Sequence, residues 1–412
     1  MMKPKQLLFI LISWFSLTVR AGIDNRYFPA FQQPNQHAEG DSSVLAANCF
    51  VMTAHDCNVD LKDRALPITD LFGRYDMIKA AQALVAIGKD NPLPTSWQSP
   101  TTLEWDTRGK VQGQGIWFGF EHIFKEQWLV GAKIPFMHLN SQLEFLQNDQ
   151  LVQDLQLGVN GNVSLHKYLN EINQALGIRS YQWQRTGFGD LDLYVGWSLV
   201  EDYFKKFKHF DLALKIGVLC PVSDMLDLDY PTAVPFGGYN HRGLYLEADW
   251  NCELKDDWHV GLWANLTGRQ AKVQQRRMPV AKELPQFGAL VGDAWVEPGF
   301  TFGISPYVWL SDLQDGLGAK ASYTIITHGQ DFWRDRRIDT LLTAQLSNVI
   351  KNSEWASEYL TVGLVYELQP VMKLTSSVPY LYLNLDIPVK MFVDTVGAAK
   401  AYRLAGGFEF NF

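Results

Sequence analysis

The sequence has few cysteines for its length and no long apolar run after its first residues. Four cysteines in 412 residues are too few for a disulfide-built scaffold. Cys49 and Cys57 are close enough in sequence to predict a local disulfide in an oxidising compartment, whereas Cys220 and Cys252 look unpaired. The spacing of cysteines and histidines matches no zinc pattern, so we expect neither a metal nor a cofactor.

Positive charge is also scarce. The chain carries 36 basic against 44 acidic residues, a net charge of -8, and it becomes more acidic if Lys3, Lys5 and Arg20 leave with a leader peptide. Nucleic-acid binding requires a basic surface, so we expect no nucleic-acid partner.

Residues 1–21 have the composition of a secretory signal peptide. Two lysines precede the apolar stretch LLFILISWFSLTV, and Val19-Arg20-Ala21 forms an acceptable cleavage site before Gly22. The cut is followed by no cysteine, which argues against a lipid-anchored protein. A secreted chain with 13% aromatic residues and no later helix-spanning run is either a large soluble β protein or an outer-membrane barrel.

The mature sequence is rich in alternation of period two. Runs of about ten residues place apolar side chains on one face and small or charged side chains on the other, as a tilted strand that crosses a bilayer requires. These runs cover residues 42–54, 110–124, 128–136, 190–199, 209–219, 243–253, 258–267, 298–310, 316–326, 359–368, 380–390 and 400–412.

The connections between these runs alternate between short and long. Residues 125–127, 254–257 and 311–315 are short connections, and residues 139–186, 221–240, 268–294 and 327–355 are long ones. Outer-membrane barrels have short periplasmic turns and long external loops, whereas a soluble β protein has no reason to sort its connections in this way. The alternation therefore predicts a barrel whose chain ends in the periplasm.

The last residues, RLAGGFEFNF, resemble the C-terminal assembly signal of bacterial outer-membrane β-barrel proteins. Phe408, Phe410 and Phe412 alternate with polar or small residues, and Gly407 lies upstream of the final aromatic. The resemblance implies the barrel assembly machinery as a partner, with outer-membrane lipid and lipopolysaccharide around the protein. We predict an all-β fold, a transmembrane antiparallel β-barrel of about 12 strands, with 14 as the alternative, in the bacterial outer membrane.

Three parts of the mature chain are assigned separately. Residues 22–41 look irregular and are expected inside or beneath the barrel, which itself covers residues 42–412. Residues 68–88 and 164–177 have helical spacing and fall in long external loops. These helices are expected either to restrict the lumen or to pack on the barrel rim.

If the apolar faces contact lipid, the opposite faces define the lumen. The candidate lumen-lining residues are Lys133, Asp192, Asp211, Lys215, Glu247, Asp249, Glu297, Lys320, Glu367, Asp386, Arg403 and Glu409. Acidic residues outnumber basic ones, and inward glycines leave room, so the sequence favours a channel for small hydrophilic solutes with a mild cation preference. Basic clusters around Arg276 and Arg336 are expected in solvated external loops.

Other function classes stay open at this stage. A plugged transporter of hydrophobic molecules, resembling the fatty-acid transporters, is favoured by aromatic candidates for the lumen such as Trp117, Trp263, Tyr307 and Tyr382. A barrel enzyme requires a nucleophile or base oriented by a second group, and we recognise no such set around the histidines. We therefore expect no enzymatic activity, and an adhesin remains a further alternative.

Overall fold

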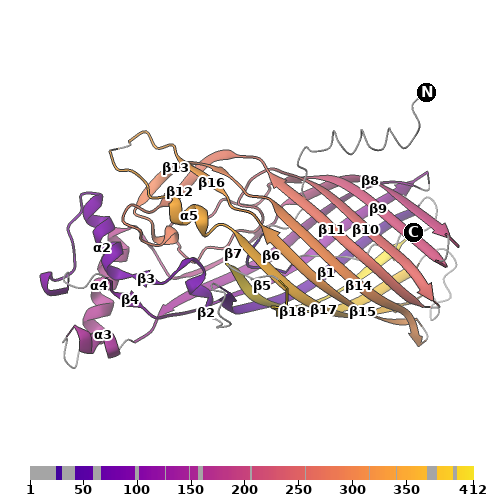
Figure 1. Ribbon diagram of the computed structural model, residues 1–412, viewed down its shortest axis with the longest axis horizontal. Coiled ribbons are helices and arrows are strands. Elements are labelled where there is room, and N and C mark those ends of the chain that lie inside the picture. Colours follow the sequence, from indigo (N-terminus) through magenta and orange to yellow (C-terminus); the bar gives the residue numbers. More distant parts are fainter. Residues whose placement is uncertain are drawn as a thin grey trace.

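The predicted strands form a closed, antiparallel barrel in the computed structural model (Figure 1). The structure describes residues 25–29, 42–58, 66–97, 102–125, 127–147, 149–155, 161–204, 207–255, 257–314, 316–339, 341–368, 378–392 and 397–412. The predicted signal peptide lies outside these residues.

Each barrel strand pairs with its neighbours in chain order, and the last strand pairs with the first. The 12 strands are β1 (Ser42–Asn58), β5 (Thr107–Phe124), β6 (Trp128–Phe145), β8 (Leu191–Asp202), β9 (His209–Cys220), β10 (Gly243–Lys255), β11 (Trp258–Arg269), β14 (Thr301–Gln314), β15 (Leu317–His328), β17 (Trp355–Glu367), β18 (Val378–Val389) and β19 (Ala398–Asn411). The closing register sets Leu45 opposite Phe410 and Met52 opposite Arg403. The predicted strand count is confirmed.

The exposure of side chains along β9 shows which face of the barrel wall points outward. Leu214 and Ile216 are 45% and 43% exposed, whereas Lys215 between them is 2% exposed. The same alternation on the other strands gives the barrel an apolar outer surface, as in Leu193 and Val195 of β8. Apolar side chains therefore face the lipid and the polar set faces the lumen, as a bilayer demands.

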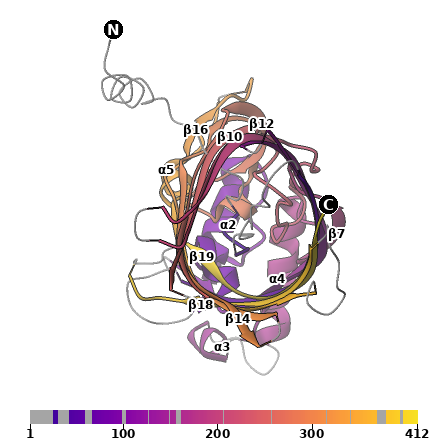
Figure 2. The ribbon, with the colours of Figure 1, turned by 90° about the vertical axis from the view of Figure 1, so that its right-hand side faces the viewer.

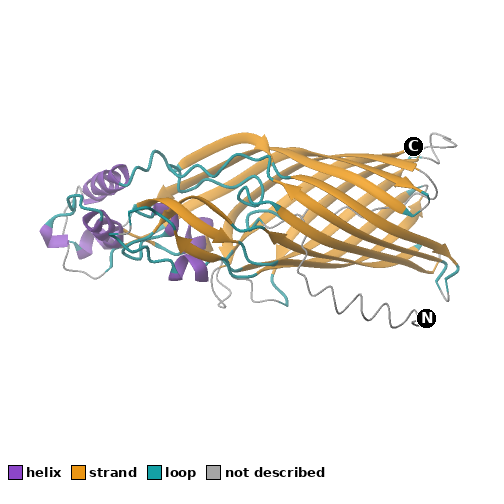
Figure 3. Cartoon of the chain, turned by 90° about the horizontal axis from the view of Figure 1, so that it is seen from above, coloured by secondary structure: helices purple, strands orange, loops and turns teal. Residues whose placement is uncertain are grey.

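The two ends of the barrel differ in their connections. At one end, here named the turn end, β5 and β6, β10 and β11, and β14 and β15 are joined by tight turns. Lys125 and Asp257 adopt positive φ angles of 52° and 66° in two of these turns, a backbone conformation typical of tight connections. The C-terminus lies at this end, opposite the helices (Figures 1 and 3).

The other end, here named the loop end, carries the secondary structure of the long connections. It comprises β2 (Leu66–Pro67), β3 (Tyr75–Asp76), β4 (Glu104–Trp105), β7 (Gln182–Phe188), β12 (Lys272–Met278), β13 (Leu290–Glu297), β16 (Phe332–Asp335), α2 (Met77–Ala86), α3 (Asp149–Asp154), α4 (Gly161–Ala175), α5 (Ser347–Lys351) and the short 3-10 helices Ile68–Phe72, Thr95–Trp97 and Pro285–Phe287. Strands β12, β13 and β16 form a separate sheet. None of the helices that the structure describes is long and apolar enough to cross a membrane.

The predicted loop helices are present, with one change. The helical spacing of residues 68–88 is broken at Gly73, whose φ is 114°, and α2 begins only after Asp76. Asp76 caps α2, because its Oδ1 accepts hydrogen bonds from the amides of Ile78 (3.0 Å) and Lys79 (3.4 Å). Helices α2 and α4 share one apolar cluster and lie beyond the barrel wall at the loop end (Figure 3).

Tyrosine rings cover inward glycines on neighbouring strands. The directly opposed pairs are Tyr194 with Gly131, Tyr245 with Gly217, Tyr307 with Gly261, and Tyr382 with Gly407. A Cβ atom at any of these glycines would overlap the opposing ring. The glycines therefore make room for aromatic rings, and our expectation that inward glycines widen the lumen was wrong at Gly217 and Gly261.

Candidate functional site

The structure places the predicted lumen residues on the inward face of the wall, with one exception. Glu297 is exposed and ends β13, where it pairs with Phe332 of the separate loop-end sheet. Pro298, Gly299 and Phe300 separate it from β14, which begins at Thr301. The prediction for Glu297 was wrong, because the alternating run was taken to begin at residue 298, directly after Glu297, whereas β14 begins only at Thr301.

The inward charges are paired with partners on other strands. Lys215 Nζ lies 2.7 Å from Glu121 Oε2, and both side chains are almost fully buried. Tyr194 donates a hydrogen bond to the same carboxylate at 2.9 Å. Inward tyrosines also donate to Asp192 (Tyr245, 3.0 Å) and to Asp249 (Tyr307, 3.1 Å). The turn-end half of the lumen is therefore filled by a network of charges and hydroxyl groups.

Acidic groups are in excess in this network. The inward carboxylates along these strands are Glu121, Asp192, Asp211, Glu247, Asp249 and Glu409, and the lysines among them are Lys133, Lys215 and Lys320. Lys133 lies over the ring of Tyr194 at 4.9 Å, and Lys320 lies over the ring of Tyr307 at 4.3 Å. Viewed along its axis from the turn end, the barrel wall is an oval ring (Figure 2).

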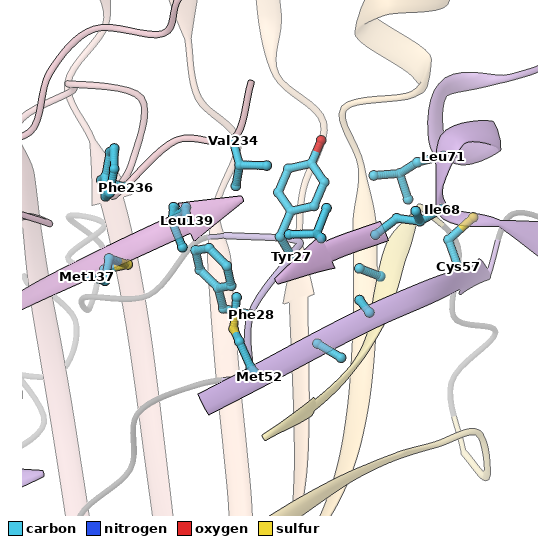
Figure 4. Close-up of a cluster of buried hydrophobic side chains, with 14 of the residues drawn as sticks. Tyr27, Phe28, Met52, Cys57, Ile68, Leu71, Met137, Leu139, Val234 and Phe236 are labelled. Carbon is cyan, nitrogen blue, oxygen red and sulfur yellow. The ribbon is translucent and has the colours of Figure 1, made fainter. Parts of the chain in front are cut away.

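The lumen nearer the loop end is crossed by residues 25–29 of the N-terminal segment. Tyr27 and Phe28 are 8% and 5% exposed, and they belong to one apolar cluster with inward residues of β1, β5, β6 and β19. Figure 4 shows both rings among Met52 of β1 and Leu139 of β6. These described residues of the predicted irregular segment therefore lie inside the barrel.

Hydrogen bonds fasten this segment to the wall and to the loops. Arg403 of β19 forms an ion pair with Asp386 (2.6 Å) and donates to the carbonyl of Pro29 at 2.9 Å. The guanidinium of Arg26 donates to the carbonyls of Asn352 (3.0 Å) and Ser353 (2.7 Å), just after α5. The segment is thus bound at both of its ends.

The β9–β10 loop, residues 221–242, folds inward against the same segment. Val234 and Phe236 are 2% and 5% exposed and belong to the cluster of Tyr27 and Phe28 (Figure 4). Asn25 donates a hydrogen bond to the carbonyl of Pro235 at 2.9 Å. We name Tyr27, Phe28, Val234 and Phe236, with the wall residues they contact, the apolar plug.

Two cavities lie on opposite sides of the apolar plug. The outer cavity, of about 160 Å³, is lined mainly by loop residues and by Tyr27, Tyr239, Trp333 and Trp355. The inner cavity, of about 110 Å³, is lined by Phe28 and by inward residues of the barrel strands, including Lys133, Asp192, Glu247 and Trp263. The N-terminal segment therefore separates an outer chamber lined by aromatic and arginine side chains from an acidic inner one.

The ion pair between Arg269 and Asp190 lies beside the plug. Arg269 Nη2 is 2.7 Å from Asp190 Oδ2, and the same carboxylate oxygen accepts from the amide of Gly238 at 2.9 Å. Both side chains are buried, and Arg269 lines both cavities. Asp190, which directly precedes β8, therefore joins the inward-folded loop at Gly238 to the end of β11 at Arg269.

Three basic residues at the end of β11 and on β12 are buried, contrary to our expectation for this cluster, whereas Lys282 and, in the second basic cluster, Arg336 are exposed. Arg269, Arg276 and Arg277 are 6%, 7% and 6% exposed, and all three line the outer cavity. Arg277 donates to the carbonyls of Leu176 (2.9 Å) and Gly288 (3.1 Å). Burial lowers the pKa of both Arg276 and Arg277.

The predicted disulfide does not form. Cys49 and Cys57 both lie on β1, eight positions apart, so their Cα atoms are separated by about 26 Å at 3.3 Å per residue. A disulfide requires Cα atoms within about 7 Å. Both cysteines are free, as are Cys220 and Cys252, and proximity in sequence misled us because the intervening residues form one extended strand.

One histidine has the hydrogen-bond partners of a catalytic set. His328 Nδ1 lies 2.7 Å from Thr301 Oγ1, and its Nε2 lies 3.1 Å from Asp331 Oδ1. However, Thr301 is 2% exposed, and Asp331 Oδ1 also accepts from the amide of Gly299 at 2.8 Å. The set therefore ties the ends of β14 and β15 to their loops, and no metal-binding group occurs among the described residues.

Strand periodicity did not place the two segments of the site that lie outside the barrel wall. Periodicity gives the inward positions of the wall, but it carries no information on where residues 25–29 and 221–242 fold. A signal was available in YPTAVPFGG (230–238), an apolar and proline-rich stretch that is unusual for a solvated external loop.

Comparisons with known proteins agree with the fold. Neither a protein-family model nor a curated protein matches the sequence. A crystal structure of an outer membrane channel from Pseudomonas putida F1 matches with a TM-score of 0.54 and 10% identity, over 93% of this chain and 100% of that chain.

Two further solved structures match at lower TM-scores. The toluene transporter TodX of Pseudomonas putida has a TM-score of 0.30 and 10% identity, over 91% of this chain and 90% of that chain. A FadL homologue of Pseudomonas aeruginosa has a TM-score of 0.31 and 8% identity, over 90% of each chain. The closed barrel and its apolar outer surface identify the class: this chain is a bacterial outer-membrane β-barrel protein. The first match shares this fold.

Proposed function

We propose that the protein is a plugged channel that takes small, largely apolar molecules into its loop-end cavity and releases them past the plug. The observation that carries this proposal is the apolar plug, in which Tyr27, Phe28, Val234 and Phe236 pack together across the lumen. A hydrated solute would have to displace buried side chains that offer it little in exchange, because Tyr27 has one hydroxyl group and Phe28, Val234 and Phe236 have no polar side-chain atom. An apolar solute loses little by passing among them.

The outer cavity supports the same substrate class. Its volume of about 160 Å³ resembles that of apolar cavities of about 150 Å³ that hold one benzene molecule. Six aromatic residues, Tyr27, Phe72, Tyr230, Tyr239, Trp333 and Trp355, line it. The solved structure with the same fold is named an outer membrane channel, which agrees with a transport role.

The expected channel for small hydrophilic solutes stays a hypothesis. It is favoured by the acidic inner cavity, with Asp192 and Glu247 facing Lys133, but such a channel requires a continuous aqueous path. The apolar plug lies across that path, so we rank the hydrophilic channel second.

Two measurements on the purified protein test the proposal. In a planar bilayer the wild type should show few or no conductance steps. In detergent, bromobenzene should quench the fluorescence of tryptophans such as Trp333 and Trp355, and Ala233→Phe, which fills the outer cavity, should weaken this quenching. The matched control is Ala132→Phe in β6 outside both cavities. Large regular conductance steps together with no saturable bromobenzene binding would overturn the proposal.

A further inference from the structure

The charge of Arg276 is not balanced by a carboxylate in the outer cavity. This side chain is 7% exposed, and it projects from β12 into the cavity. Within the described residues no carboxylate oxygen lies within ion-pair distance of its guanidinium. The hydrogen-bonding orientation of Gln274 presents its amide oxygen 2.6 Å from Arg276 Nη2, but a neutral acceptor cannot neutralise the charge.

Among the four arginines of the cavity lining, Arg269 has a carboxylate partner, whereas Arg26, Arg276 and Arg277 meet neutral acceptors. Arg269 is neutralised by Asp190, and Arg26 and Arg277 donate to backbone carbonyls of the loops. Asp331, the nearest acid that influences Arg276, is held by His328 and by the amide of Gly299. Burying an unpaired guanidinium is costly, so a cavity that keeps one is suited to a ligand that supplies the anion.

Aromatic rings hold Arg276 in place on two sides. Its Cζ atom lies 5.1 Å from the ring centroid of Tyr239 and 5.9 Å from that of Trp333. Such contacts stabilise a buried cation. The Gln274 amide oxygen meets Nε and Nη2, so among the described residues Nη1 is the nitrogen left to donate to an anion. Across the cavity lining there are four arginines (Arg26, Arg269, Arg276 and Arg277) and two aspartates (Asp227 and Asp331), so the chamber carries a positive excess.

We propose that the outer cavity binds a small amphipathic monoanion of about one aromatic ring, with its carboxylate on Arg276 and its ring against the apolar lining. This inference rests on the proposed function and specifies its substrate class. The planar guanidinium matches a carboxylate in shape and charge, and the single ring matches the size of the cavity.

The test compares benzoate with benzyl alcohol, its neutral analogue, on the purified full-length protein. Binding is measured at neutral pH by isothermal titration and by tryptophan fluorescence. Benzoate should bind the wild type about tenfold more tightly than benzyl alcohol does. Arg276→Gln should remove this preference, and Arg276→Lys, which keeps the charge without the planar fork, should retain part of it.

The matched control is Arg334→Gln. Arg334 lies on β16 of the same sheet and also stacks on aromatic rings, Trp295 at 5.2 Å and Phe332 at 4.9 Å, but it is exposed and lies outside the cavity lining. This variant should bind benzoate as the wild type does. Heat-modified electrophoretic mobility confirms that each variant is folded.

The outcomes separate this inference from the proposed function. Equal affinity of the wild type for benzoate and benzyl alcohol would overturn the anion site and leave the apolar channel standing. Equal loss of benzoate binding in Arg334→Gln would also overturn it, as would displacement of benzoate by inorganic phosphate at equal concentration. Absence of binding of both ring compounds would count against the proposed function itself.

Discussion

The two halves of the lumen are built by different means. The turn-end half is filled by side chains of the barrel strands, such as Lys215, Glu121 and Tyr194, which pair across neighbouring strands. The loop-end half is filled by Tyr27 and Phe28, which come from segments outside the wall and pack through apolar contacts. The wall half is fixed by the barrel register, whereas the plug half is held by contacts that can be broken without opening a strand pair.

The largest effect is expected from emptying the plug. Tyr27→Ala combined with Phe28→Ala removes two buried rings, each worth about 3–5 kcal/mol of packing. A loss of about 3 kcal/mol changes the ratio of open to closed channel by about a hundredfold. Single-channel recording should therefore show frequent conductance steps in this variant and rare ones in the wild type.

A matched control removes two aromatic rings from the lipid-facing surface. Phe118 and Phe120 of β5 are 46% and 44% exposed, so Phe118→Ala with Phe120→Ala should leave the conductance of the wild type unchanged. If the Tyr27 and Phe28 variant is as silent as this control, the N-terminal segment is not the barrier.

Substitutions in the charged, turn-end half of the lumen are expected to change the stability of the barrel. Lys215→Met leaves the buried carboxylate of Glu121 without its cation, which costs about 3–5 kcal/mol. The urea midpoint for unfolding from lipid vesicles should fall accordingly. Adding Glu121→Gln should recover most of the loss, and Lys255→Met at the exposed end of β10 should cause none. Equal midpoints for Lys215→Met and Lys255→Met would show that this ion pair does not stabilise the barrel.

The difference between the wall half and the plug half of the lumen also explains which features could be predicted from the sequence. A membrane strand must alternate, so the inward positions of Asp192, Lys215 and Arg403 follow from a period of two once the apolar face is assigned to lipid. The number of barrel strands can be predicted too, because each strand that crosses the membrane gives a separate run of alternating apolar residues. These features depend on local constraints that every strand obeys separately.

The plug and the outer cavity depend on contacts between distant segments. Asn25 donates to the carbonyl of Pro235 across 210 residues of sequence, and no local pattern specifies such a contact. The basic residue Arg276 was expected in solvent for the same reason, since sequence alone does not show that a loop folds back over it. The prediction for Glu297 was wrong because a three-residue break between β13 and β14 is small beside the apolar run that follows.

A smaller loss of stability is expected from placing a charge on the lipid face. Ile216 is 43% exposed on the outer surface of β9, next to the inward Lys215. A lysine near the middle of the bilayer costs about 2–4 kcal/mol, so Ile216→Lys should lower the urea midpoint, although lysine is the natural residue one position away. Ile216→Met is the control, with an expected cost below about 1.5 kcal/mol. No difference between the two variants would mean that this face does not contact lipid.

The smallest effect tests how the tyrosines and glycines of the lumen fit together. In Gly261→Ala the new methyl group would overlap the ring of Tyr307, and moving this ring strains its hydrogen bond to Asp249, so we expect a cost of about 1–3 kcal/mol. Gly406→Ala is the matched control, because its Cβ would lie 3.5 Å from its nearest neighbours, an ordinary contact. Tyr307→Leu in the Gly261→Ala background should reduce the cost of the added methyl, and a double-mutant cycle measures this coupling. Zero coupling would show that the glycine is not required by the ring, and the wall half of the lumen would then tolerate change as readily as the plug half.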